Sequence, residues 1–182
     1  MTTVTTLPFG RALTRADLDL MPEDGHRYEL IDGVLLVSPS PELPHQDMVG
    51  NLHLLLRAGC PPHLKVVLAP FEVVLAEDTC IQPDLLVAPR SQFTRKELPG
   101  APLLAVEVLS PSTRRIDLLL KRDRLQSAEA SSYWIVDPVE VAVTVLELHD
   151  GTYREIAHVV GGQSCDVLLP FPMTLVPEQL LD

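Results

Sequence analysis

The sequence has few of the residues that define several familiar protein classes. It contains three cysteines in 182 residues, Cys60, Cys80 and Cys165, and no two have the close spacing of a zinc site or a redox motif. An odd number of widely separated cysteines does not build a disulfide framework. We therefore expect reduced, structural thiols in a cytoplasmic protein.

Long apolar runs are also missing. No stretch reaches the roughly 18 apolar residues that a membrane helix needs. The first ten residues, MTTVTTLPFG, have neither the basic start nor the apolar core of a signal peptide. We expect no membrane association, and we expect residues 1–10 to form a flexible N-terminal segment.

Positive charge is scarce but concentrated. The chain has 14 Lys and Arg against 25 Asp and Glu, a net charge of −11, which argues against a protein that coats DNA through its overall charge. Eight of the 14 basic residues nevertheless lie in residues 90–124 with only four acids, whereas residues 137–182 hold eight acids and one arginine. Binding to a polyanion is therefore expected to be local and salt-sensitive.

Several catalytic and nucleotide-binding motifs are absent. The sequence has no Gly-x-Ser-x-Gly elbow, no glycine-rich phosphate loop and no dinucleotide fingerprint. It also has no helix-turn-helix, zinc-finger or RNA-binding aromatic motif. Any chemistry must therefore come from residues that the fold brings together.

The length and composition predict one globular domain over residues 1–182, with 46% apolar and 21% charged residues. Asp32-Gly33 and Asp150-Gly151 each separate two apolar runs and predict β-hairpins. Apolar spacing predicts helices over 45–57 and 114–130, the second capped by Ser112 or Thr113. Its expected buried side is marked by Ile116, Leu119, Leu120 and Ala128.

Short, apolar, β-branched segments predict the strands. They cover residues 65–68, 71–76, 83–88, 102–109, 133–136 and 141–148, with later strands at 153–160 and 167–169. The runs at 85–88 and 103–109 are nearly continuous, as in central strands buried on both faces. The expected fold is α/β (α+β), with a mixed central sheet flanked by helices and added hairpins.

Three polar residues interrupt these apolar stretches. Asp84 follows Pro83, Glu107 lies within a strand, and Lys121 follows the run Asp117-Leu-Leu-Leu. An unpaired carboxylate costs several kcal/mol when buried, so two of them on neighbouring strands call for a cation. Oxygen ligands suit Mg²⁺, which stabilises charge on a phosphoryl group.

Each residue alone also has a simpler interpretation. Asp84 could cap a turn, Glu107 could lie at an exposed strand end, and Asp117 with Lys121 could form a surface ion pair on a helix. The ordered set on strand, strand and helix is less common than any one of its parts.

The motifs and their order resemble a known family. They are Arg27-Tyr-Glu-Leu-Ile-Asp-Gly33, Pro44-His-Gln46, Gln82-Pro-Asp84, Glu107-Val-Leu-Ser-Pro-Ser-Thr113, Asp117 with Lys121, and Tyr133-Trp-Ile-Val-Asp-Pro138. Over about residues 10–182 the chain resembles the Uma-type family of putative restriction endonucleases, a domain family of unknown function in the PD-(D/E)xK nuclease superfamily. The resemblance implies a nuclease-like core with a carboxylate pair between central strands.

The resemblance also implies site residues. Asp84 corresponds to the acid of the PD motif and Glu107 to the acid of the (D/E)xK motif, with the backbone carbonyl of Val108 as a further metal ligand. The motif's lysine would fall at Leu109. Lys121, on the following helix, is its expected replacement, placed to orient water or neutralise phosphoryl charge.

Two more residues lie in matching stretches and have two open interpretations each. Glu29 is either a further site carboxylate or an outward residue of a hairpin strand. His45 opens a helix, where it is either a proton relay or phosphate contact, or else a local cap or a solvent-facing ring.

These features predict a metal-dependent phosphodiesterase that acts on nucleic acid, with DNA favoured. The expected enzyme is Mg²⁺- or Mn²⁺-dependent and endodeoxyribonuclease-like, and a homodimer is expected because strand edges such as 141–148 need covering. The alternative is a nuclease-fold protein with weak or no catalysis that acts as a nucleic-acid-binding or dimeric interaction module.

Overall fold

The structure, a computed structural model, describes residues 8, 10–111 and 114–181. Its largest sheet has six strands in the order β11 (Thr152–Val160), β10 (Ala142–His149), β9 (Ser132–Asp137), β8 (Leu104–Val108), β6 (Leu85–Pro89) and β3 (Leu64–Leu68). Strands β8 and β9 are parallel and the other pairs are antiparallel, so this sheet is mixed, as expected.

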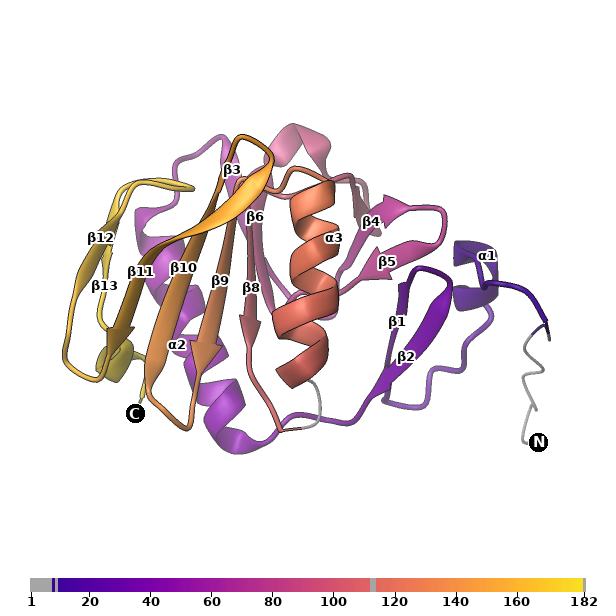
Figure 1. Ribbon diagram of the computed structural model, residues 1–182, viewed down its shortest axis with the longest axis horizontal. Coiled ribbons are helices and arrows are strands. Elements are labelled where there is room, and N and C mark those ends of the chain that lie inside the picture. Colours follow the sequence, from indigo (N-terminus) through magenta and orange to yellow (C-terminus); the bar gives the residue numbers. More distant parts are fainter. Residues whose placement is uncertain (1–7, 9, 112–113, 182) are drawn as a thin grey trace.

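A second sheet of five strands stands beside the first (Figure 1). Its order is β2 (Val34–Ser38), β1 (Arg27–Ile31), β5 (Thr79–Ile81), β4 (Glu72–Ala76) and β7 (Glu97–Pro99). A small sheet pairs β12 (Cys165–Val167) with β13 (Met173–Leu175). Strands β5, β7 and β13 were not predicted from the sequence, because three residues are too few to show a period.

Helices cover both faces of the six-stranded sheet. The long helix α2 (Leu43–Gly59) lies behind the sheet in Figure 1, and α3 (Arg122–Ser127) lies in front. A π-helical segment, η2 (Ile116–Lys121), leads into α3. The remaining helices are short: α1 (Arg15–Leu18), η1 (Arg90–Gln92) and η3 (Pro177–Leu180). Among the described residues, no helix is long and apolar enough to cross a membrane.

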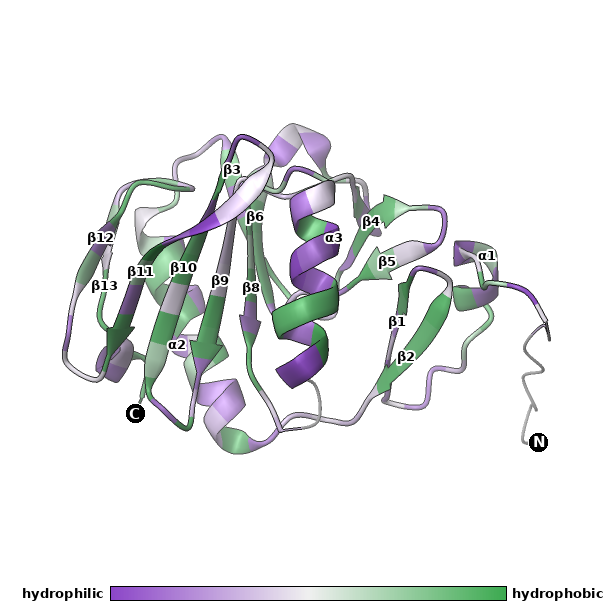
Figure 2. Cartoon of the chain, viewed as in Figure 1, coloured by the Kyte–Doolittle hydropathy of each residue, from purple (hydrophilic) through white to green (hydrophobic). Residues whose placement is uncertain are grey.

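The two-residue period of the central strands assigns their side chains to these two faces. Leu85, Val87, Leu104, Val106, Trp134 and Val136 pack with Met48, Leu52 and Leu56 of α2. The alternate residues Leu86, Ala88, Ala105, Tyr133 and Ile135 pack with Leu125 of α3. The central strands are mostly hydrophobic in Figure 2, because neither of their faces meets solvent.

Both predicted hairpins are present. Asp32 and Gly33 have φ values of 51° and 72° and connect β1 to β2, and Asp150 and Gly151, at 51° and 76°, connect β10 to β11. Positive φ at both turn residues is what a two-residue hairpin requires, which explains why Asp-Gly predicted them correctly.

The second predicted helix differs in detail. It is helical from residue 114, ends at Ser127 rather than near residue 130, and its caps Ser112 and Thr113 lie outside the described residues. The predicted buried side was wrong for Leu119 and Leu120, which are 59% and 45% exposed. The polar pair Asp117 and Lys121 faces the interior instead.

The predicted strand edge was also wrong. Strand β10 lies between β9 and β11 and is therefore internal, so β11 forms that edge of the sheet.

The two hairpin glycines allow a matched stability test. An added Cβ at Gly33 would lie 2.5 Å from the Cβ of Ala12, whereas nothing lies within 4 Å of one at Gly151. We expect Gly151→Ala to cost about 1 kcal/mol for its left-handed backbone, and Gly33→Ala to cost about 1–3 kcal/mol more from overpacking. Urea unfolding of both variants measures the difference, and equal losses would contradict it.

Candidate active site

Two carboxylates lie side by side on neighbouring strands. Asp84 immediately precedes β6, and Glu107 is in β8; because Leu85 pairs with Val106 in an antiparallel register, the next pair along is Asp84 with Glu107. The Glu107 side chain points to the face covered by η2 and α3, where it meets Lys121. The Asp84 side chain meets Arg27 of β1 and His45 at the start of α2. Asp84 and Glu107 are 3% and 1% exposed, so the interpretation of Glu107 as an exposed strand end does not apply.

Asp84 is held by three donors. Its Oδ2 accepts a hydrogen bond from the backbone N–H of Val108 at 2.9 Å and lies 3.1 Å from Nε2 of His45. Its Oδ1 accepts from Nη1 of Arg27 at 2.8 Å. Burial alone would raise the pKa of Asp84, but the His45 contact and the Arg27 charge outweigh it and lower the pKa. Asp84 is therefore ionised at neutral pH.

Glu107 belongs to a second group, centred on Lys121. The Nζ atom of Lys121 lies 3.0 Å from Oε1 of Glu107, 3.0 Å from Oε1 of Glu29 and 3.4 Å from Oδ1 of Asp117. All four side chains are at most 2% exposed. One buried ammonium thus faces three carboxyl groups, which leaves two negative charges in excess if all three ionise.

The excess negative charge shifts the pKa values of Glu107 and Lys121. Burial raises the pKa of Glu107 well above its ordinary value, and the charges of Asp117, Asp84 and Glu29 raise it further, against the opposing effect of Lys121. For Lys121, burial lowers the pKa, but Glu107, Glu29 and Asp117 together raise it. Lys121 therefore stays charged, while Glu107 keeps its proton to a higher pH than an ordinary glutamate does.

The π-helical turn η2 carries both Asp117 and Lys121. The hydroxyl of Tyr133, on β9, donates to the backbone carbonyl of Asp117 at 2.9 Å and ties this turn to the sheet. Such turns are rare and are often found at functional sites. Leu109, where the motif's lysine would stand, packs in the apolar cluster beneath α3. The ammonium group beside Glu107 is therefore that of Lys121 in η2, and not one from β8.

The first strand contributes two charged residues to the same place. Glu29 accepts a hydrogen bond from the backbone N–H of Gln82 at 2.7 Å, so it faces inward rather than outward on the hairpin. Arg27 lies two residues earlier and therefore on the same side of β1. No role was predicted for Arg27 from the sequence, although its two-residue spacing from Glu29 places both side chains on one side of the strand.

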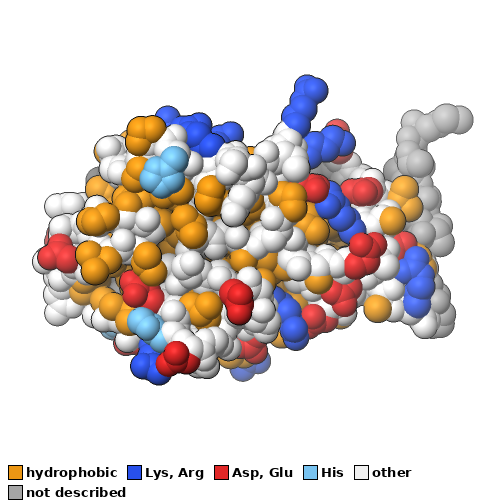
Figure 3. Space-filling view, turned by 90° about the horizontal axis from the view of Figure 1, so that it is seen from above, with side chains coloured by type: hydrophobic (Ala, Val, Ile, Leu, Met, Phe, Trp, Pro, Cys, Tyr) orange, Lys and Arg blue, Asp and Glu red, His pale blue; other side chains and the backbone are white. Residues whose placement is uncertain are grey.

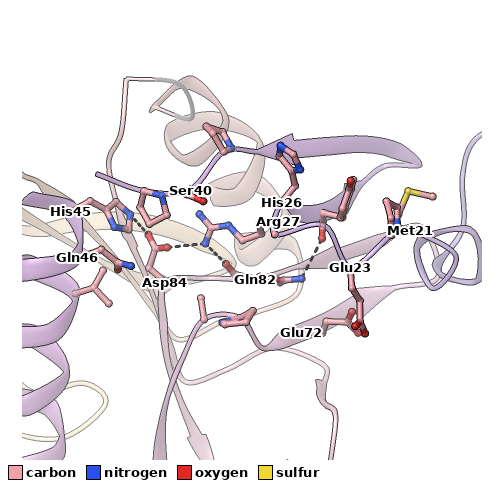
Figure 4. A pocket seen from close by; sticks show the side chains of 18 of the residues that line it. Met21, Glu23, His26, Arg27, Ser40, His45, Gln46, Glu72, Gln82 and Asp84 are labelled. Carbon is pink, nitrogen blue, oxygen red and sulfur yellow. Dashed lines mark hydrogen bonds and ion pairs between the residues drawn. The ribbon is translucent and has the colours of Figure 1, made fainter. Parts of the chain in front are cut away.

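Two cavities open beside Asp84. One of about 580 Å³ is lined by Asp84 itself, and a second of about 400 Å³ is lined by Leu109, Pro111 and Val139 among others. Arg27, His45 and residues 39–41 line both, and Figure 4 shows Arg27 and His45 pointing toward Asp84 from opposite sides. His45 is 7% exposed and so is not a solvent-facing ring. Glu107 and Lys121 line neither cavity.

The donor set suits a hard divalent cation. Asp84 and Glu107 offer oxygen ligands on adjacent strands, and the two excess negative charges of the Lys121 group match a dication. No three His, Cys, Asp or Glu side chains in the described part of the chain form a complete metal-binding group. Mg²⁺ fits such a site, because it commonly uses one or two protein carboxylates and keeps several waters.

The opposite pKa shifts of the two carboxyl groups predict opposite effects of amide substitution in a metal-free buffer. Glu107→Gln removes an unfavourable buried charge and should raise the free energy of unfolding at pH 7.5 by about 1–3 kcal/mol. Asp84→Asn breaks the contact with Arg27 and should lower it by about 2–4 kcal/mol. Urea unfolding with a chelator present measures both.

The pH dependence of these effects follows from their signs. The folded-state pKa of Glu107 is raised, so its stabilising contribution is full below the unfolded pKa of about 4.3 and is lost at higher pH. The gain from Glu107→Gln should therefore disappear at pH 4. The folded-state pKa of Asp84 is lowered, so the loss from Asp84→Asn should persist down to pH 4. A destabilised Glu107→Gln protein at pH 7.5 would contradict this account.

The chain and its fold match known proteins. The model of the Uma2 family, described as "Putative restriction endonuclease", matches residues 15–178. The crystal structure of a "putative nuclease" of the DUF820 family from Anabaena variabilis superimposes with a TM-score of 0.71 at 20% identity, covering 92% of this chain and 97% of that chain. A search of curated proteins gives no match. With the family model covering nearly the whole chain, this protein belongs to the Uma2 family.

Proposed function

We propose that the protein is a metal-dependent nuclease that hydrolyses phosphodiester bonds in nucleic acid, with DNA as the favoured substrate. The observation that carries the proposal is the contact of Lys121 with Glu107, on the strand next to Asp84. This set of two strand carboxylates and one lysine is the one that the resemblance to nucleases implies. The family description and the fold of the Anabaena protein support the same class of reaction.

The two strand carboxylates are the proposed metal ligands. Asp84 and Glu107 would hold Mg²⁺ or Mn²⁺, with the backbone carbonyl of Val108 as a further ligand. A divalent cation held there would supply the positive charge that stabilises negative charge on a phosphoryl group. Asp84 is ionised before any ligand arrives, since its pKa is lowered in the folded protein.

Lys121 is proposed to act as a hydrogen-bond donor and a fixed positive charge. Its pKa is raised, so it has no free lone pair at neutral pH and does not serve as a general base. Glu29 and Asp117 hold the ammonium group against Glu107. In that position it can orient the attacking water and stabilise charge on the phosphoryl oxygens. Hydrolysis breaks the bond to the 3′ oxygen and leaves a 5′-phosphate.

His45 is the proposed proton relay or phosphate contact. An ionised carboxylate only accepts hydrogen bonds, so the Nε2 atom that faces Asp84 carries a proton. The Nδ1 atom has no hydrogen-bond partner within the described residues. Because His45 lines both cavities, Nδ1 can exchange a proton with a bound substrate or water after a small rotation of the ring.

Substrate binding is proposed to be local. The net charge is −11, and the face shown in Figure 3 has acidic and basic side chains interspersed rather than a continuous basic tract. Cavities of about 580 and 400 Å³ beside Asp84 are the size of ligand pockets. Attraction to the phosphate backbone should therefore depend on a few contacts near the site and weaken with salt.

The first test is cleavage of labelled duplex and single-stranded oligonucleotides with Mg²⁺ or Mn²⁺. We expect cleavage by the natural protein and a loss of roughly 100-fold or more in Asp84→Asn, Glu107→Gln and Lys121→Met. Glu155→Gln, an exposed position on β11, is the matched control and should keep full activity.

Two results would refute the enzymatic proposal. One is a folded protein that cleaves no substrate with any divalent metal and binds none. The other is nucleic-acid affinity that depends neither on metal nor on Asp84, which would favour a binding module on the same fold.

We also propose that residues 1–182 form one domain and that the protein acts as a homodimer. One apolar cluster joins Ile31 and Val73 of the five-stranded sheet to Leu86 and Ala105 of the six-stranded sheet, which supports a single domain. Strand β11 is a sheet edge with Ile156 and Val160 exposed, and such edges need covering. Light scattering should give twice the chain mass of 20.1 kDa, and a monomer at micromolar concentration would contradict this. The proposed location is the cytoplasm, where free thiols such as these three stay reduced.

A further inference from the structure

Arg27 stands between the buried carboxylates and the cavities. Its Nη1 atom donates to Oδ1 of Asp84 at 2.8 Å and to the carbonyl of Gln82 at 3.2 Å (Figure 4). The Arg27 side chain is 20% exposed, whereas that of Asp84 is 4% exposed. Arg27 thus contacts the buried Asp84 and also lines the two cavities.

The contacts of Asp84 put Arg27 in competition with any metal. Oδ2 of Asp84 already faces two donors, the N–H of Val108 and Nε2 of His45. Each carboxylate oxygen accepts about two hydrogen bonds, so Oδ1 is the oxygen left for a further ligand, and Arg27 occupies it. A dication on Oδ1 would lie beside the guanidinium, and two positive charges at that separation repel each other.

The charges and cavities around Arg27 indicate how its side chain could move. It contacts Asp84 directly, and the charges of Glu29 and Glu107 also attract it. A bound dication would largely cancel this negative charge. With that attraction reduced, the guanidinium is no longer held at Asp84. It already lines both cavities, so a small side-chain movement presents it to whatever fills them. Guanidinium binds phosphate through paired hydrogen bonds.

We propose that Arg27 is the built-in counter-cation of Asp84, which a divalent metal displaces, and that the displaced guanidinium then binds a phosphate of the nucleic-acid substrate. This inference rests on the proposed nuclease function and adds a substrate-contacting residue to it. Arg27 then opposes metal binding and favours substrate binding. By linkage, a phosphate that draws Arg27 from Asp84 also tightens the metal site.

The opposite signs of these two effects make the proposal testable without measuring catalysis. We expect Arg27→Gln to bind Mn²⁺ about tenfold more tightly than the natural protein, since one opposing charge is removed from the site. We expect the same variant, saturated with Mn²⁺, to bind a labelled phosphorothioate oligonucleotide about tenfold more weakly. Electron paramagnetic resonance of free Mn²⁺ and fluorescence anisotropy measure the two affinities.

Three further proteins make the result specific. Arg27→Lys keeps the charge and should bind Mn²⁺ within about threefold of the natural protein. Arg27→Met removes the hydrogen bonds as well and should repeat the tighter Mn²⁺ binding. Arg124→Gln removes an arginine whose ion pair with Asp32 at 2.9 Å is on the surface, and it should change neither affinity.

Several outcomes would overturn the inference. Unchanged or weaker Mn²⁺ binding in both Arg27→Gln and Arg27→Met would show that Arg27 does not compete with the metal. Unchanged oligonucleotide affinity would remove its role in phosphate binding. If only these fail while the natural protein binds metal and cleaves, the nuclease proposal stands; if no variant binds metal, both proposals fall.

Discussion

The arrangement of the site depends on one buried ammonium group. Lys121 lies within 3.0 to 3.4 Å of three carboxyl groups from three elements: Glu29 of β1, Glu107 of β8 and Asp117 of η2. Because these carboxylates are almost fully buried, none of them could stay ionised there without a nearby positive charge. The lysine thus connects the five-stranded sheet, the six-stranded sheet and the helix in front of it.

The alternation of side chains along the strands of the sheet determines on which face the charged residues lie. Alternation along β6 and β8 sends Leu85 and Val106 toward α2. It sends Glu107 toward Lys121 of η2. Asp84, just before β6, meets His45 at the start of α2 and Arg27 of β1. A shift of one residue in either strand would exchange these faces and leave a carboxylate in the apolar core against α2. The continuous apolar strands that flank the site therefore also fix which way its charges point, and the catalytic proposal uses the same register that builds the core.

Much of the fold could be predicted because its signals are local. Asp-Gly turns, apolar strands and the α2 period depend on neighbours in sequence, and the structure has each of them. The pairing of strands that are far apart in the sequence leaves no local pattern from which it could be predicted. The grouping of strands into two sheets, the inward face of Lys121 and the contact of Arg27 with Asp84 could not be deduced from spacing. The prediction that Leu119 and Leu120 are buried was wrong, because the ion pair of Asp117 and Lys121 occupies the buried side of that helix.

The same physics explains how an acidic protein can act on a polyanion. The overall charge of −11 opposes attachment along the length of a nucleic acid, because that attachment scales with the number of phosphates neutralised. Binding must then come from the few groups that line the cavities, and two of these, Arg27 and His45, contact Asp84. In the proposed mechanism, a cation on the carboxylates would compete with Arg27 for Asp84 and free its guanidinium for a phosphate. Substrate binding would then depend on the few groups at the site and not on the overall charge of the protein.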